Sequence, residues 1–139
     1  MNWKLIFLLS LFGLAMGIAT IFLIPSHIEP FFWLIIFIIC AYLIAKYAPG
    51  KYFLHGLLVS IVNSIWITGA HFLLFYHYIA AHPEHLEMVA SMPPALAAHP
   101  RRVMLLIGPM AGIASGIILG LFSWLASKIV KDKRGVNVV

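Results

Sequence analysis

A polar stripe follows one side of the third apolar stretch of the chain. Drawn as a helix with 100° per residue, the stripe covers an arc of about 80° and consists of Gly56, Ser60, Asn63 and His71. Polar side chains within a membrane helix normally face the bundle interior, where they find partners. The stripe predicts a cleft that binds a ligand head group or passes a proton, with plain interhelical hydrogen bonding as the alternative. The candidate ligand-binding residues are Asn63, Trp66 and His71.

A second group of residues, "HPEHLE" at 82–87, contains side chains that can ligate metals. Imidazole nitrogens and carboxylate oxygens bind zinc and other first-row metals, and the candidate ligands are His82, Glu84 and His85. The spacing differs from H-E-x-x-H, in which two histidines share one helical face, and Pro83 interrupts the backbone between them. The group predicts a metal or pH-sensing site, with a solvated loop carrying unrelated histidines as the alternative.

Several chemistries lack the residues that they require. A membrane dithiol oxidoreductase needs paired cysteines, and Cys40 is the only cysteine in the sequence. Bis-histidine haem ligation needs histidines on facing helices, whereas His55 and His71 share one apolar stretch. All four acidic residues lie outside the apolar stretches, which argues against a carboxylate-driven transporter. The sequence therefore predicts no catalytic residue and no cofactor.

The composition predicts that these residues lie in a membrane. Hydrophobic residues make up 63% of the 139 residues and charged residues 9%, whereas soluble domains contain about 25% charged residues. In water such a chain would expose large apolar patches. The formal net charge is +5, but the basic residues flank apolar stretches and are not interleaved with base-stacking aromatics. Nucleic-acid binding is therefore not expected, and the expected surroundings are a lipid bilayer.

Four stretches are apolar enough to cross a bilayer, which takes about 20 helical residues each. They cover residues 5–24, 31–46, 52–78 and 102–128. The sequence predicts an all-α protein, a single transmembrane domain over residues 1–139 folded as an integral membrane four-helix bundle. Residues 79–101 connect the last two spans and are expected to hold a short amphipathic helix that begins near Pro83.

The positions of lysine and arginine predict the orientation of the spans. With four crossings, only Arg101 and Arg102 of the nine lysine and arginine residues lie on one side, and the others lie on the opposite side. Cytoplasmic loops carry the excess of positive charge. Both termini are therefore expected in the cytoplasm, residues 79–101 outside it, and the protein in the bacterial inner (cytoplasmic) membrane.

The fourth span contains "GPMAGIASGIILG", with a glycine at every fourth position. A glycine inside a helix costs about 1 kcal/mol relative to alanine. In lipid, however, small residues four apart allow helices to associate by close backbone contact. The predicted helix-packing residues are Gly13 and Gly17 in the first span, Gly56 and Ser60 in the third, and Gly108, Gly112, Gly116 and Gly120 in the fourth.

The bulky second span is expected at the periphery. Alternatively, the glycines of the fourth span could pack against the same span of a second copy and form a homodimer.

Three segments carry a family resemblance: "PSHIEPFFW" between the first two spans, "FLHGLLVS" at the start of the third, and the glycine segment of the fourth. Over most of its length the chain resembles a group of uncharacterised small bacterial inner-membrane proteins with four spans. The resemblance implies a four-span fold, and it implies no activity and no site residues.

Three functional hypotheses follow from these features. The leading one is a non-enzymatic accessory or scaffold subunit that acts by helix packing, alone, as a homodimer or with a membrane complex partner, because of the glycine stripes and the uncharged spans. The second is a binder or transporter of a small molecule or lipid with a polar cleft at spans three and four. The third is a metal-dependent enzyme or sensor that uses the extracytoplasmic histidines.

Overall fold

The computed structural model describes residues 1–135, and every regular element in this range is a helix. The helices are α1 (Trp3–Phe22), α2 (Glu29–Tyr47), α3 (Tyr52–Leu73), α4 (Phe75–Ala81), α5 (Glu84–Ala90), α6 (Pro94–Ala97) and α7 (Pro100–Gly135). Among them α1, α2, α3 and the 100–130 part of α7 are each long and apolar enough to span a membrane. The all-α class and the four candidate spans are therefore confirmed.

Local sequence signals set several helix boundaries. The Asn2 side chain caps α1 by accepting a hydrogen bond from the backbone N–H of Leu5 at 3.1 Å. Pro30 lies in the first turn of α2, where its missing N–H would have had no intrahelical acceptor. The turn before α3 contains Gly50 with a φ of 152° and Lys51 with a φ of 50°. Glycine adopts such a positive φ without steric cost, which explains its place in this turn.

The long connection and the helices beside it differ from the prediction in their boundaries. The predicted span 52–78 is divided at Leu74, with α3 ending one residue before it and α4 beginning one residue after it. The expected short helix after Pro83 is α5, and α6 adds a further single turn. α7 is longer than the predicted 102–128 and continues without interruption through Pro109.

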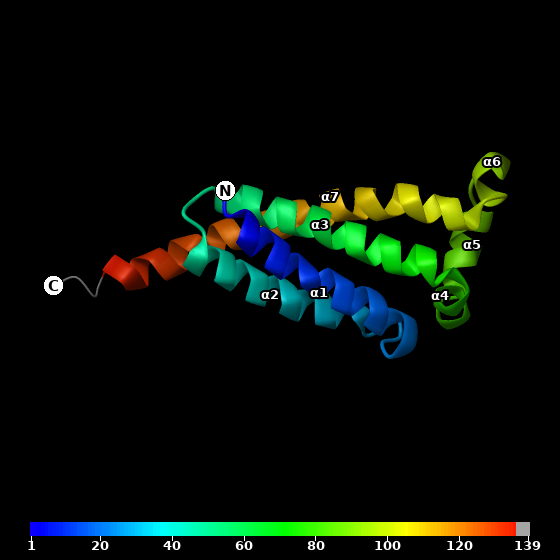
Figure 1. Ribbon diagram of the computed structural model, residues 1–139, viewed down its shortest axis with the longest axis horizontal. Helices are drawn as coiled ribbons and strands as arrows, with labels where there is room; N and C mark the ends of the chain where they lie inside the picture. Colours follow the sequence, from blue (N-terminus) through cyan, green and yellow to red (C-terminus); the bar gives the residue numbers. More distant parts are fainter. Residues whose placement is uncertain (136–139) are drawn as a thin grey trace.

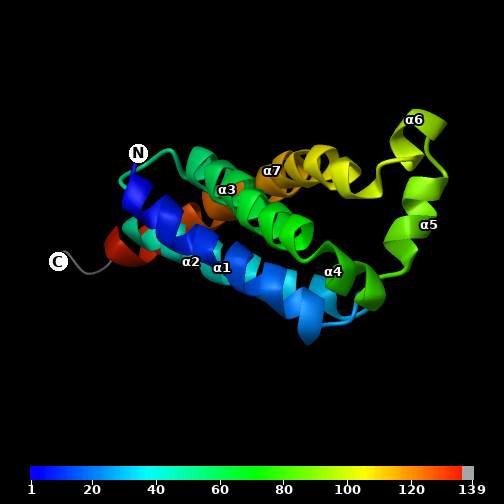
Figure 2. The same cartoon turned by 45° about the vertical axis from the view of Figure 1, so that its right-hand side comes forward.

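The helices form a bundle in which α3 packs between α1 and α7, and α2 packs mainly on α7. Figure 1 shows the N-terminus, the 48–51 turn and the last turns of α7 at one end of the bundle, here called the terminal end. The 23–28 connection and helices α4 to α6 lie at the opposite, loop end. Figures 1 and 2 both show α2 and α7 converging near the terminal end and diverging toward the loop end.

Small residues occur on both sides of the contact between α3 and α7. A Cβ added at Gly56 would lie 2.6 Å from the backbone oxygen of Leu119 and 2.8 Å from the Cα of Gly120. The two antiparallel helices meet in a regular series of pairs: Thr68 with Gly108, Ser64 with Gly112, Ser60 with Ser115, and Gly56 with Gly120. The helix backbones therefore approach too closely for larger side chains along this contact, which we call the α3–α7 seam.

The opposite side of α3 packs closely on α1. A Cβ added at Gly13 would lie 2.7 Å from the Cα of Asn63, and one added at Gly17 would lie 3.2 Å from the Cα of Ile67. Together with Gly116, whose added Cβ would meet the backbone oxygen of Leu57 at 3.0 Å, these contacts place every predicted packing residue at a helix–helix contact within the chain.

The second span is not as peripheral as its bulky sequence suggests. Much of α2 is exposed, but Cys40 and Ile44 are fully buried and Ala45 is 1% exposed. Cys40 and Ile44 pack into an apolar cluster that also contains Ile6 of α1 and Leu119 of α7. The predicted peripheral position therefore describes most of α2, but not this face, which belongs to the core. The α2 helix carries apolar side chains on every side, so the hydrophobic pattern of its sequence could not indicate which face is buried.

We expect Gly56→Ala to lower the free energy of unfolding by about 1–3 kcal/mol, because the new Cβ would press on the backbone of α7 at Leu119 and Gly120 as well as on the Ser123 hydroxyl. Gly69→Ala is a matched control in the same helix, since nothing lies within 4 Å of its added Cβ. It should be neutral or stabilise the helix by up to about 1 kcal/mol. Equilibrium unfolding in detergent measures both, and equal effects of the two variants would contradict the packing described for the seam.

Candidate functional site

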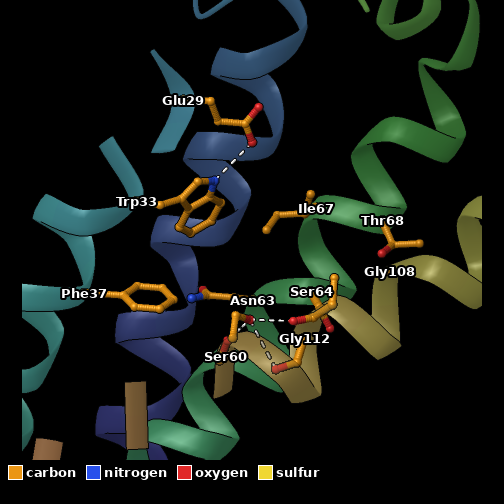
Figure 3. Close-up of a pocket in the computed structure, with 12 residues that line it drawn as sticks. Glu29, Trp33, Phe37, Ser60, Asn63, Ser64, Ile67, Thr68, Gly108 and Gly112 are labelled. Carbon is orange, nitrogen blue, oxygen red and sulfur yellow. Dashed lines mark hydrogen bonds between the residues drawn. The ribbon is translucent and has the colours of Figure 1, made fainter. Parts of the chain in front are cut away.

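A cavity of about 300 Å³ lies where α2 diverges from α7, and α3 closes it between these two helices. Three helices contribute its walls, as Figure 3 shows. The lining residues are Glu29, Trp33 and Phe37 of α2, Ser60, Asn63, Ser64, Ile67 and Thr68 of α3, and Gly108, Ala111, Gly112 and Ser115 of α7. Its volume lies at the lower limit of known small-molecule pockets, which begin at about 300 Å³. The cavity can therefore hold a small group and not a large one.

Aromatic residues of α2 form one wall of the cavity. The indole N–H of Trp33 donates to a carboxylate oxygen of Glu29, one helical turn away, at 3.1 Å. The Trp33 and Phe37 rings pack edge to face, with centroids 6.2 Å apart. Glu29 is the one charged residue of the lining and lies at the first residue of α2, near the loop end. Deeper in the cavity the wall is apolar apart from neutral hydroxyl and amide groups.

Asn63 is buried between α1 and the cavity, with 2% of its surface exposed. Its Oδ1 accepts a hydrogen bond from the backbone N–H of Gly13 at 3.0 Å. A backbone N–H can only donate, so the side-chain oxygen of Asn63 must face α1. The amide NH2 group at Nδ2 must then face away from α1. This nitrogen is buried and has no hydrogen-bond partner. Figure 3 shows it pointing toward the Phe37 side of the cavity.

The serine hydroxyl groups that line the same cavity already have partners. Ser60 and Ser115 are joined across the α3–α7 seam by a hydrogen bond of 2.7 Å between their Oγ atoms. Ser115 donates to the backbone oxygen of Ala111, and Ser64 donates to that of Ile61, each at 2.7 Å. Asn63 therefore differs from these neighbours in that it keeps two unused N–H donors at the cavity.

The other two predicted ligand residues, Trp66 and His71, contact α1. The indole N–H of Trp66 donates to Ser10 Oγ at 3.1 Å. His71 Nε2 lies 3.0 Å from Thr20 Oγ1, and because the Thr20 hydroxyl donates to a backbone oxygen of α1, His71 is the donor. All three candidates thus connect α3 to α1, and Asn63 alone among them also lines the cavity.

Histidines and a tyrosine form a stacked cluster at the loop end. The Tyr78 ring lies between His71, at a centroid distance of 4.0 Å, and His82, at 4.6 Å. His85 meets the same ring edge on at 5.7 Å. The Nε2 atoms of His82 and His85 are buried without hydrogen-bond partners. The cluster therefore holds these imidazoles by ring contacts more than by hydrogen bonds.

The predicted metal ligands are not arranged as a metal centre. Within residues 1–130, for which side chains are described, no group of three or more His, Cys, Asp or Glu residues is close enough to hold a metal ion. His82 is 2% exposed and stacks on Tyr78. Glu84 accepts a hydrogen bond from the Ser26 hydroxyl of the 23–28 connection. A metal site at His82, Glu84 and His85 stays a prediction, and this arrangement gives it no support.

The environment of the loop end shifts three titrating groups away from their ordinary pKa values. Burial raises the pKa of Tyr78 to about 12, assisted by the negative charges of Glu29 and Glu84. The hydrogen bond from Ser26 lowers the pKa of Glu84. Burial lowers the pKa of His85, against the opposing effect of the Glu84 charge. Neutral His85 and ionised Glu84 are thus the forms that the folded loop end favours.

No family model matches the chain, and no curated protein or solved structure is significantly similar to it. The resemblance to small bacterial four-span proteins therefore stays a prediction.

We expect acidification to loosen the loop end. Because the folded pKa of His85 lies below the ordinary 6.5, its contribution to stability is complete above that pH and decreases as the pH falls below it. Because the pKa of Glu84 is also lowered, its contribution to stability likewise decreases on acidification, at still lower pH. Hydrogen exchange of the α5 amides, corrected for intrinsic rates, should show less protection at pH 5 than at pH 7.

His85→Gln keeps a polar side chain that does not titrate and is the matched variant for this experiment. It should reduce the pH dependence of α5 protection. Protection of α5 that is equal at both pH values in the unmodified protein would contradict the environment described for His85.

Proposed function

We propose that this protein is a multi-pass membrane protein that binds a small, neutral and mainly apolar molecule, carrying a hydrogen-bond acceptor, taken directly from the bilayer. The cavity supports this function because it lies where α2 and α7 diverge, so that a guest could enter sideways between these two helices. The observation that carries the proposal is the buried Nδ2 of Asn63, a donor without a partner beside that cavity. Buried polar groups are nearly always satisfied, so each exception calls for an explanation.

The proposed setting is the bacterial inner membrane, with both termini in the cytoplasm. The excess of lysine and arginine at the terminal end of the bundle supports this orientation. The aromatic and small-residue lining near the loop end would then lie in the outer half of the bilayer, where Glu29 would be near the lipid head groups and Asn63 near the centre.

The scaffold hypothesis rests on the glycine stripes and on the uncharged spans, and the stripe of α7 already has contacts within the chain. Gly108, Gly112, Gly116 and Gly120 all contact α3 of the same chain. A homodimer through that stripe would have to displace α3. The stripe therefore explains how the chain folds more directly than it indicates an assembly partner.

Ala111→Trp tests the proposal by filling the cavity from α7. Ala111 lines the cavity but is not part of the α3–α7 seam, so the indole should occupy the guest's space without separating the helices. Native mass spectrometry of protein released from mild detergent should find a bound lipid-phase molecule in the wild type and lose it in this variant.

Ala114→Trp is the matched control, because Ala114 is exposed on the same helix and lines no described cavity. It should retain the guest as the wild type does, and both variants should keep the wild-type circular dichroism spectrum. A wild-type protein that carries no guest, or a guest that survives Ala111→Trp, would count against the proposed function.

A further inference from the structure

The position of Asn63 restricts the chemistry of a guest. It lies near the middle of α3, which runs from Tyr52 to Leu73, and at 1.5 Å per residue it is about 15 Å from either end. In the proposed topology this depth is the centre of the hydrocarbon region, which is about 30 Å thick. A guest that accepts a hydrogen bond from Asn63 Nδ2 must therefore carry its acceptor atom into the hydrocarbon region of the bilayer.

Charge and depth exclude several kinds of occupant. The cavity walls beyond Glu29 carry no charge, so an ion at Asn63 would be desolvated without a counter-charge, which is strongly unfavourable. The ester carbonyls of a phospholipid lie near the head groups and would not reach the bilayer centre. What remains is a neutral molecule that partitions into the hydrocarbon as a whole and carries an acceptor oxygen, such as a carbonyl oxygen.

The shape of the lining favours a flat head group. One wall is formed by the Trp33 and Phe37 rings. The opposite wall on α7 has only short side chains, because it consists of Gly108, Ala111, Gly112 and Ser115. A planar ring can lie between an aromatic wall and a glycine-rich backbone, and ring–ring contacts add to the apolar burial. The volume of about 300 Å³ accommodates a single substituted ring.

An apolar groove continues from this cavity along α2 and α7. It shares Glu29, Trp33 and Phe37 with the cavity, includes Ser26 and Pro30 at its loop end, and is otherwise lined by Leu34, Ile118 and Phe122 on the surface of the bundle. The Phe37 and Phe122 rings meet edge to face at 6.4 Å. The groove offers a path for a long apolar tail that leaves the cavity toward the lipid.

We propose that the guest is a membrane quinone, whose neutral ring lies in the cavity with one carbonyl oxygen accepting a hydrogen bond from Asn63 Nδ2 and whose isoprenoid tail follows the groove between α2 and α7. The inference rests on the proposed function, since it needs the same cavity to be a binding site. It adds the chemical class of the guest and the residue that recognises it.

Two probes with the same tail test this inference: decylubiquinone, and decylbenzene, which lacks carbonyl oxygens. The purified full-length protein in detergent should bind the quinone about tenfold more tightly than the alkylbenzene, as one hydrogen bond to a buried donor allows. The infrared carbonyl band of the bound quinone should be shifted to lower frequency. Asn63→Leu should remove both the preference and the shift, and leave alkylbenzene binding in place.

The outcomes separate this inference from the proposed function. If neither probe binds the wild type, and Ala111→Trp changes nothing, both are overturned. If both probes bind equally and the carbonyl band does not shift, the cavity remains a binding site and the quinone assignment is overturned. These wild-type measurements decide the question even if Asn63→Leu fails to fold.

Discussion

The structure depends on close backbone contact between α3 and its two neighbours. Within hydrocarbon, packing has to replace the hydrophobic effect as the force that joins helices, and glycine permits the shortest approach. Gly56 lies against the backbone of α7, while Gly13 of α1 lies against the backbone of Asn63. Because α3 makes these contacts on two sides, it is the central helix, and the remaining helix, α2, has to pack on the outside of α7.

The same small residues also produce the candidate site. Near the terminal end, the small and apolar residues around Cys40 bring α2 into the core. Toward the loop end α2 moves away from α7, and Gly108 and Gly112, which have no side chains to fill the space, form both the seam and one wall of the cavity. Tight packing on one face of α7 and an open volume beside it therefore have a common cause. The amide NH2 group of Asn63, which has no hydrogen-bond partner, lies beside this cavity.

Strong local signals made much of the fold predictable from sequence. The apolar stretches predicted four helices able to span a membrane, and the four-residue repeats predicted which helix faces approach closely. The site was only partly predictable. Asn63 and His71 belong to one polar stripe of the helix, and Trp66 lies beside it. All three residues hydrogen-bond to α1, and only Asn63 also lines the cavity, which depends on the positions of α2 and α7 and not on the pattern of α3 alone. Trp33 gave no signal among the many aromatics of α2, whereas Thr68 extends the 56–60–64 repeat and could have been recognised.

Cysteine cross-linking across the seam tests the central claim most directly. Ser60 and Ser115 have Oγ atoms 2.7 Å apart, so Ser60→Cys with Ser115→Cys, in a Cys40→Ala background, should form a disulfide on mild oxidation in membranes. The account predicts a cross-link within one chain, seen as a monomer whose fragments stay joined after proteolysis between α3 and α7. Dimers linked by these cysteines, or no cross-link at all, would contradict the packing of α7 on α3 of the same chain.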